Sequence, residues 1–455
     1  MTQWQQGSSI ELTIASLSDR GDGVGRWGDR VVFVPDTVTG DRVRVRLVRV
    51  KKQYAHGQIQ SVLKPSEYRI RPRCLVADKC GGCQWQHVED VYQRQAKVQI
   101  VLEALERIGG FTELPIASPL FAATHPLHYR NKATYPLGLS QQQTVQAGYY
   151  RRGSHQIVNL NQCPVQDERL DCLLADIKLD IAAQQWTIYN ERQHMGQLRH
   201  LSLRIGRRTG EVLVTLISRN SNLPDLLTQA QQWQAKYPEL VGVCVNINPK
   251  PGNIIFGDRT HCIVGRDYLE EEFAGLTLQL RSETFFQVNT EVAEALLAVI
   301  AQRLELQGTE TLLDAYCGIG TFTLPLAQRV KTAIGVERQS SAITQARANA
   351  QLNHITNAEF HCAAVEDWLT PEQPCPDIVL LDPPRKGCDR TVISALLSLL
   401  PPQILYISCK PATLARDLKL LCADGQYQLV YVQPADFFPQ TPHVECAAFL
   451  QRRTE

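Results

Sequence analysis

A cysteine at the end of one apolar run is placed where a nucleophile would be useful. Residues 404–411 have the sequence ILYISCKP, so Cys409 follows a strand-like segment and precedes the cation Lys410 and a proline. An unperturbed thiol has a pKa near about 8.5, and a neighbouring cation or a following helix N-terminus favours the reactive thiolate. Buried cysteines at strand ends are common and usually inert. The position of Cys409 alone therefore does not establish a nucleophile.

A glycine-rich turn and two carboxylates indicate a binding site for a nucleoside cofactor. Residues 314–321 have the sequence DAYCGIGT after an apolar strand, and Thr323 stands where a dinucleotide fingerprint needs its third glycine. A nicotinamide cofactor is therefore not expected. The short turn that follows Asp314 fits S-adenosylmethionine, whose positively charged groups are an ammonium and a sulfonium. Glu337 closes the next strand, where a carboxylate accepts hydrogen bonds from ribose hydroxyls.

A proline pair ends a later strand of the same region. Residues 382–387 have the sequence DPPRKG. Prolines stop the ladder and hold the following loop at the carboxyl edge of the sheet, where open α/β folds bind ligands. Such a loop can position a flat base, although a proline pair alone can equally serve only to end a strand.

A second candidate site consists of four cysteines, Cys74, Cys80, Cys83 and Cys163. The first three are spaced C-x5-C-x2-C, and two glycines open the loop between the second and third. Four thiolates can hold either a zinc ion or an iron–sulfur cluster, and the spacing does not choose between them.

The residues from 283 onward predict the fold that positions Cys409, the glycine-rich turn and the proline pair. Apolar strands alternate with helical segments, which is typical of an α/β domain with a mostly parallel sheet covered on both faces. The last two strand-like segments, at about 427–451, predict an antiparallel hairpin at one edge. Residues 281–455 are therefore predicted to form the catalytic domain.

The front of the chain has a different pattern. Residues 5–63 form short strands between turns, and the segment RVRVRLVRV puts Arg42, Arg44 and Arg46 on one face, which predicts a small OB-like β-barrel with a basic outer face. Residues 64–280 are predicted to form a mixed α+β central domain. It begins with a helix at 89–108, whose apolar stripe includes Val91, Val101 and Ile108 and which we expect to pack on the catalytic domain.

Composition and charge limit the classes of protein to which this chain can belong. A chain of 455 residues is long enough for two or three domains. Net charge is only +1, but residues 1–73 hold 13 Lys and Arg against 7 Asp and Glu, a local excess of +6 that suits a phosphate backbone. No apolar run reaches the roughly 18 residues of a membrane span, and the start of the chain lacks the features of a signal peptide. We expect a cytoplasmic protein without membrane contact, and therefore reduced cysteines.

Five motifs together resemble the RNA uracil-C5 methyltransferase family. They are LLDAYCGIGTF, SETFFQVN, LLDPPRKGCD, YISCKPATLARDL and FFPQTPHVECAAFL, and their order matches throughout residues 283–455. The front of the chain is similar to the 23S ribosomal RNA branch of that family, with a TRAM domain at about 5–63 followed by the cysteine group. The resemblance implies a Rossmann-like class I methyltransferase domain behind the barrel and the central domain.

The resemblance also implies roles for single residues. Cys409 would add to C6 of a uracil, and Glu445 would be the general base. Four residues match the family's positions for binding S-adenosylmethionine: Gln287, Tyr316, Glu337 and Asp382. The four cysteines would hold a [4Fe-4S] cluster, and the substrate would be 23S rRNA, methylated by a monomer. Lys410 departs from the family, which more often has Asn or Asp after the cysteine.

Three alternatives stay open beside this interpretation. A tRNA could be the substrate instead of rRNA. An RNA cytosine-C5 methyltransferase uses similar covalent chemistry but typically has a cysteine directly after the proline of the DPP motif, where this chain has Arg385; Cys388 lies too far along the chain. A non-catalytic RNA-binding iron–sulfur protein is disfavoured by the presence of Cys409 and Glu445.

Overall fold

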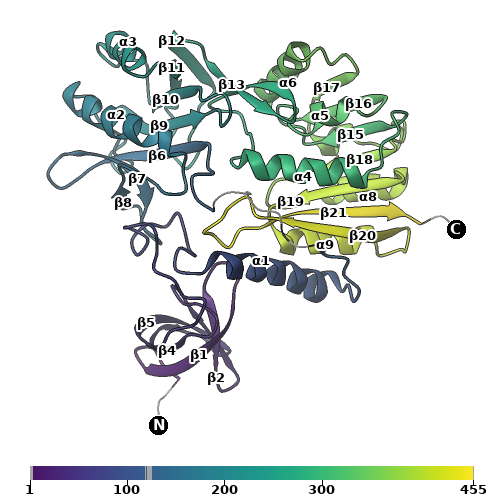
Figure 1. Cartoon of the computed structure of the whole chain (residues 1–455), viewed down its shortest axis with the longest axis horizontal. Coiled ribbons are helices and arrows are strands. Elements are labelled where there is room, and N and C mark those ends of the chain that lie inside the picture. The colour runs from purple at the N-terminus through teal and green to yellow at the C-terminus, as the bar shows by residue number, and fades with distance from the viewer. Residues whose placement is uncertain (1–3, 118, 120–125, 454–455) are drawn as a thin grey trace.

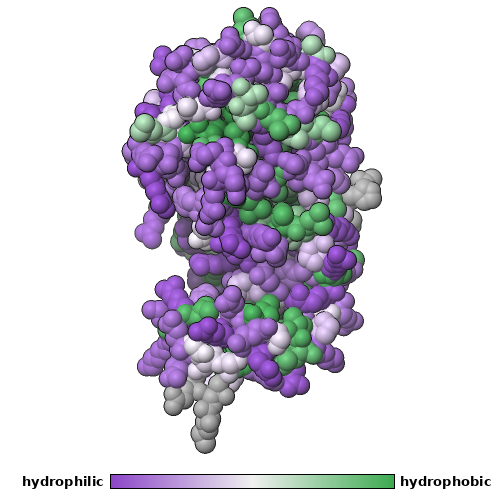
Figure 2. Space-filling model, turned by 90° about the vertical axis from the view of Figure 1, so that its left-hand side faces the viewer, coloured by the Kyte–Doolittle hydropathy of each residue, from purple (hydrophilic) through white to green (hydrophobic). Residues whose placement is uncertain are grey.

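The computed structural model describes residues 4–117, 119 and 126–453, which form three parts (Figure 1). In that view a small barrel lies at the bottom, a second sheet with two helices lies at the upper left, and a third sheet lies to the right. In the side view of Figure 2 hydrophilic residues cover most of the surface, and hydrophobic residues form separate patches. None of the helices in the described part of the chain has the length and apolar character needed to span a bilayer.

The N-terminal part is a closed barrel of five strands in the order β1-β2-β3-β5-β4. The strands are β1 (Ser9–Leu17), β2 (Gly23–Trp27), β3 (Arg30–Val34), β4 (Arg42–Val50) and β5 (Tyr54–Lys64). The alternation predicted for β4 is present, because Val43 and Val45 are fully buried while Arg42, Arg44 and Arg46 are exposed. Two of these arginines, Arg42 and Arg44, bind Glu11 of β1 at 3.2 and 2.7 Å. This pairing makes the outer face less positive than the sequence alone indicates.

The central part is built on a seven-stranded sheet of order β12-β11-β10-β9-β6-β7-β8. Its strands are β6 (Lys132–Leu139), β7 (Val145–Tyr150), β8 (Ile157–Asn159), β9 (Leu198–Ile205), β10 (Val212–Ser218), β11 (Leu240–Ile247) and β12 (Arg259–Gly265). Helices α2 (Asp171–Ala183) and α3 (Leu226–Lys236) pack on this sheet, and a two-stranded ribbon of β13 (Tyr268–Phe273) and β14 (Leu276–Arg281) leads into the third part.

The third part is a sheet of order β17-β16-β15-β18-β19-β21-β20. Its strands are β15 (Thr311–Ala315), β16 (Thr332–Glu337), β17 (Ala358–Cys362), β18 (Ile378–Leu381), β19 (Gln403–Ser408), β20 (Tyr427–Ala435) and β21 (Glu445–Arg452). Its helices are α4 (Thr290–Arg303), α5 (Thr323–Ala327), α6 (Ser340–Leu352), α7 (Val365–Trp368), α8 (Arg390–Leu399) and α9 (Pro411–Leu421). The first five strands in the order are parallel, and β21 and β20 form an antiparallel edge, as predicted.

Helix α1 (Asp90–Ala104) ends in a π-helical turn, Leu105–Gly109, and packs against α9 and β20 of the third part. The apolar stripe predicted for it is partly wrong, because Val91 and Ile108 are 47% and 41% exposed. The helix instead buries Gln93 and Lys97, which find polar partners in the loop after β20. The π-turn also changes the helical register after Ala104.

Candidate active site

Two of the predicted site residues face each other in the third sheet, at the carboxyl end of its parallel strands. Cys409 follows the last residue of β19, and Glu445 is the first residue of β21. In this antiparallel pair Ser408 lies opposite Cys446, so the register continued by one residue places Cys409 opposite Glu445. Residues directly opposite in an antiparallel pair have Cα atoms about 4.5–5.5 Å apart. A thiol and a carboxyl group are therefore presented together at the carboxyl end of β19.

Burial dominates the acid–base behaviour of Glu445. The side chain is buried, and burial raises the pKa of Glu445 to about 7, although the guanidinium of Arg385 acts in the opposite direction. A carboxyl group with a pKa near neutrality can take up and release a proton at physiological pH. Glu445 therefore has the acid–base properties of a general base.

A cation from the loop after β18 acts on Cys409. Burial raises the pKa of the Cys409 thiol, and the carboxylates of Glu445 and Asp382 raise it further. Arg385, from the loop after β18, lowers the same pKa by its charge and by a hydrogen bond. The expectation that Lys410 or the N-terminus of the following helix favours the thiolate stays a prediction. Sequence reasoning quoted Arg385 only as the residue after the proline pair and did not assign it a role.

The glycine-rich turn after β15 is open and is preceded by a buried acid on that strand. Tyr316 and Gly320 have φ values of 93° and 85°, and a Cβ atom built on Gly318 would meet nothing within 4 Å, so a ligand can approach the backbone there. Asp314 is buried, and one of its oxygens accepts a hydrogen bond from the Thr323 hydroxyl. The other oxygen, Oδ1, has no hydrogen-bond partner, and burial raises the pKa of Asp314 to about 7.

The remaining predicted cofactor residues lie on elements around this turn. Glu337 closes β16, and its carboxylate accepts a hydrogen bond from the Gln339 backbone at 2.8 Å. Asp382 follows β18 and is half-buried; burial and the carboxylates of Glu445 and Asp314 hold its pKa well above the usual range. Gln287 is buried in the segment between β14 and α4.

These residues fit S-adenosylmethionine. A buried carboxylate oxygen without a partner is a ready acceptor for an ammonium group, and a carboxylate at the end of the second strand suits ribose hydroxyls. The parallel sheet, the open glycine turn after its first strand and the antiparallel edge together define a class I S-adenosylmethionine-dependent methyltransferase.

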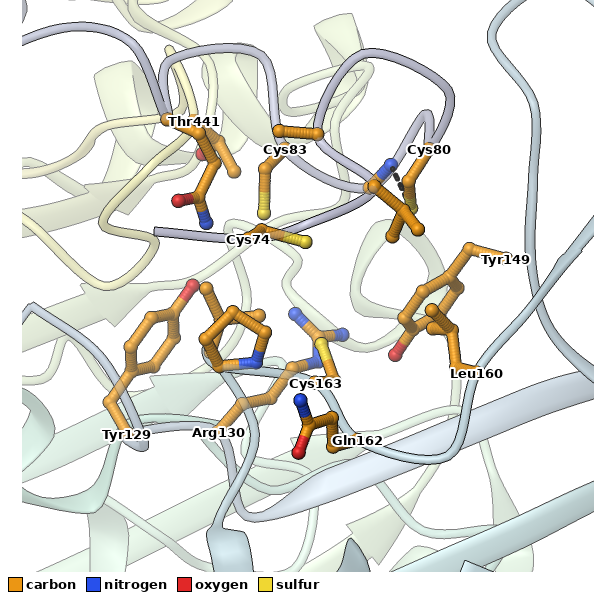
Figure 3. Close-up of a pocket in the computed structure, with 16 residues that line it drawn as sticks. Cys74, Cys80, Cys83, Tyr129, Arg130, Tyr149, Leu160, Gln162, Cys163 and Thr441 are labelled. Atoms are coloured by element: carbon orange, nitrogen blue, oxygen red, sulfur yellow. Dashed lines mark hydrogen bonds between the residues drawn. The ribbon is translucent and has the colours of Figure 1, made fainter. Parts of the chain in front are cut away.

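Figure 3 shows that the four predicted cysteines line one cavity, of about 230 Å³. The sulfurs of Cys74, Cys80, Cys83 and Cys163 point toward its interior. Burial raises the pKa of Cys83 to about 12 and that of Cys163 to about 11, and the neighbouring thiols contribute to both shifts. Gln86, buried in the cavity wall, forms a side-chain hydrogen bond with Cys83 that lowers the pKa of this thiol. Within residues 4–117, 119 and 126–453, however, no group of three or more His, Cys, Asp or Glu side chains could hold a metal ion.

Comparison with known proteins identifies the family. The tRNA (Uracil-5-)-methyltransferase family matches residues 109–372 and 373–453, and the TRAM domain family matches residues 3–59. The chain is 61% identical to an uncharacterized RNA methyltransferase of Nostoc sp., over 98% of this chain and 97% of the relative. It is 37% identical to one of Bacillus cereus, over 97% and 96%. The structure resembles Pyrococcus abyssi tRNA (uracil-54, C5)-methyltransferase in complex with S-adenosyl-L-homocysteine, with a TM-score of 0.77 and 27% identity over 97% of this chain and 99% of that one.

The chain therefore belongs to the tRNA (uracil-5-)-methyltransferase family and is an S-adenosylmethionine-dependent RNA methyltransferase with an N-terminal TRAM domain. The predicted family, fold class and methyl donor are confirmed. The roles of single residues, the limits of the three domains, the identity of the RNA and the [4Fe-4S] cluster stay predictions.

Proposed function

We propose that this enzyme methylates C5 of a uridine in 23S rRNA through a covalent adduct on Cys409. The observation that carries the proposal is the placement of Cys409 opposite Glu445, at the sheet edge that also carries the open glycine turn. S-adenosylmethionine, when bound, supplies an electrophilic methyl group. The chemistry left to the protein is to make C5 nucleophilic and then to remove its proton.

Cys409 performs the first task. C5 of uracil is a poor nucleophile, and addition of a thiolate to C6 makes C5 electron-rich enough to attack a methyl group, so that one difficult step becomes two easier ones. Arg385 supports this step because it lowers the pKa of the thiol, while burial and two carboxylates raise that pKa. The same guanidinium also limits how far burial raises the pKa of Glu445.

Glu445 performs the second task. Once C5 carries the methyl group, its proton passes to the Glu445 carboxylate, the electron pair of the C5–H bond re-forms the C5–C6 double bond, and the sulfur leaves as the Cys409 thiolate. A base with a pKa of about 7 is ionised at slightly alkaline pH and is strong enough to accept this proton. We propose that S-adenosylmethionine is bound by Gln287, Tyr316, Glu337 and Asp382. Asp314 is an additional carboxylate of the same site.

The proposed chemistry is tested with unmodified RNA transcripts and the full-length enzyme. We expect methyl transfer from radiolabelled S-adenosylmethionine to 23S rRNA, and no transfer by Cys409→Ala. RNA that contains 5-fluorouridine should form a stable linkage to residue 409, because fluorine blocks removal of the group at C5. Absence of this linkage with active enzyme would contradict the covalent mechanism.

The second candidate substrate is a tRNA. It is favoured by the likeness to the Pyrococcus abyssi enzyme, whose printed name specifies a tRNA uracil. The two substrates are separated by offering the enzyme 23S rRNA and a tRNA transcript at equal concentration. Methylation of tRNA alone would overturn the rRNA assignment and leave the covalent mechanism intact.

We also propose that the four cysteines hold a [4Fe-4S] cluster. The support is that four thiols and the buried side chain of Gln86 line one cavity, into which the sulfurs point. A zinc ion, with each sulfur about 2.3 Å from the metal, is the alternative that the same four thiolates allow. A cluster of four irons spreads its thiolates around a larger centre. Anaerobically purified protein should be brown and contain iron and sulfide, and Cys83→Ala should lose both; a colourless zinc protein would contradict the proposal.

A further inference from the structure

The loop between β20 and β21, residues 436–444, leads directly into Glu445, and its first residue is fixed by a buried ion pair. The ammonium of Lys97 in α1 lies 2.5 Å from the Asp436 carboxylate and also donates a hydrogen bond to the Phe438 carbonyl at 3.0 Å. The side chains of Lys97 and Asp436 are 0% and 4% exposed. A buried pair with these bonds holds the start of the loop against the helix.

The middle of the loop is held by Gln440, which is buried and has a φ of 69°. Its side-chain amide donates a hydrogen bond to Asp90 at 2.9 Å and its Oε1 accepts one from Gln93 at 3.2 Å. Its backbone N–H donates to the Gln93 side chain at 2.9 Å. A non-glycine residue keeps a positive φ in a buried loop only where surrounding contacts determine it strongly.

Gln440 is also hydrogen-bonded to the segment that follows Cys83, one of the four cysteines. The backbone N–H groups of Gln84 and Trp85, the two residues after Cys83, both donate to the Gln440 carbonyl, at 3.1 and 3.0 Å. The next residue, Thr441, lines the cysteine cavity (Figure 3). Part of the loop that ends in Glu445 is therefore a wall of that cavity.

We propose that Gln440 is a positioning residue through which the cysteine cavity sets the place of Glu445 in the active site. The inference rests on the proposed role of Glu445 as the base. Glu445 faces Arg385 from the loop after β18, Cys409 after β19 and Asp382 at the end of β18. A shift of the loop would change the distance of the carboxyl group from all three and from the C5 proton.

The test compares four variants of the full-length enzyme: Cys83→Ala, Gln440→Ala, Gln440→Asn and Gln95→Ala. Gln95 is the matched control, because it is a glutamine of α1 that is exposed. In the free protein, hydrogen exchange of residues 436–445 should be about 30-fold faster in Gln440→Ala, the factor for losing two side-chain hydrogen bonds of ordinary strength. It should also be faster than in the wild type in Cys83→Ala. Gln440→Asn, which keeps an amide and tolerates positive φ, should recover part of this protection.

The kinetic readout separates positioning from general damage. In Gln440→Ala we expect kcat to fall by about 100-fold, the loss typical of a misplaced catalytic group, with KM for RNA unchanged and the covalent RNA adduct accumulating. Unchanged exchange of residues 436–445 in Cys83→Ala would overturn the inference, as would a raised KM with normal kcat. If Cys83→Ala does not fold, Thr441→Val repeats the exchange test from the loop side of the cavity. If exchange is faster in Cys83→Ala and Gln440→Ala but Glu445→Gln turns over normally, the base assignment is refuted. The coupling between the cysteine cavity and the loop would then still stand.

Discussion

Replacing Glu445 by glutamine should raise the stability of the protein at alkaline pH as well as block release of the product. Burial raises the pKa of Glu445 from an ordinary value of 4.5 to about 7. Each pKa unit is about 1.4 kcal/mol, so the ionised carboxylate costs the folded state about 3 kcal/mol at pH 8 relative to the unfolded chain.

The sign of the pH dependence follows from which state binds the proton more tightly. Because the folded protein holds this proton up to a higher pH, the contribution of Glu445 is most favourable below pH 4.5 and is lost between about pH 4.5 and 7. Glutamine has no proton to lose, so Glu445→Gln should exceed the wild type by less than about 1 kcal/mol at pH 5 and by about 3 kcal/mol at pH 8. Asp382, whose pKa is raised partly by the Glu445 carboxylate, should add to the difference in the same direction.

Urea-induced unfolding at pH 5, 6, 7 and 8 measures this difference directly. Glu67→Gln serves as the matched control, because Glu67 is exposed and should show no such pH-dependent gain. A difference between Glu445→Gln and the wild type that stays constant from pH 5 to pH 8 would refute the reasoning. In the same variant a covalent protein–RNA adduct should accumulate on denaturing gels, and normal turnover would show that the base is another group.

Three further predictions concern groups around this site. Lys97→Met should lower the free energy of unfolding in urea by about 3–5 kcal/mol, because it leaves the buried Asp436 charge without its partner. The double variant Lys97→Met/Asp436→Leu should recover most of this loss. A loss below about 1 kcal/mol in Lys97→Met would contradict the buried pair. Arg385→Gln should shift alkylation of Cys409 by iodoacetamide to higher pH, as followed by mass spectrometry, and an unchanged profile would show that Arg385 does not act on the thiol. Affinity for S-adenosylmethionine, measured by calorimetry, should rise from pH 6 to pH 8 because the pKa of Asp314 is about 7, and Asp314→Asn should remove this rise; the same rise in the variant would assign it to another group.

Local sequence patterns were enough to predict the general fold. Strict alternation in RVRVRLVRV corresponds to β4, whose inward residues fill the barrel. Strands alternating with helices after residue 283 correspond to the parallel sheet. Because parallel strands present their carboxyl ends at one edge, residues that follow β15, β16, β18 and β19 could be placed together from the sequence. The opposition of Cys409 and Glu445 needed one more fact, the antiparallel register of β19 and β21, which the sequence does not contain.

The residues that sequence reasoning missed are polar groups whose partners lie far along the chain. Hydrophobic periodicity identifies the buried face of a helix only when that face is apolar. In α1 the buried face carries Gln93 and Lys97, whose partners are 347 and 339 residues away, so both resemble solvent-exposed residues in the sequence. A buried lysine without its partner would be strongly unfavourable, and its burial therefore depends on a carboxylate that only the folded chain supplies. It follows that α1 can adopt its observed position only when the loop that leads into Glu445 is also in place, which makes this helix part of the active-site support rather than a connector between domains.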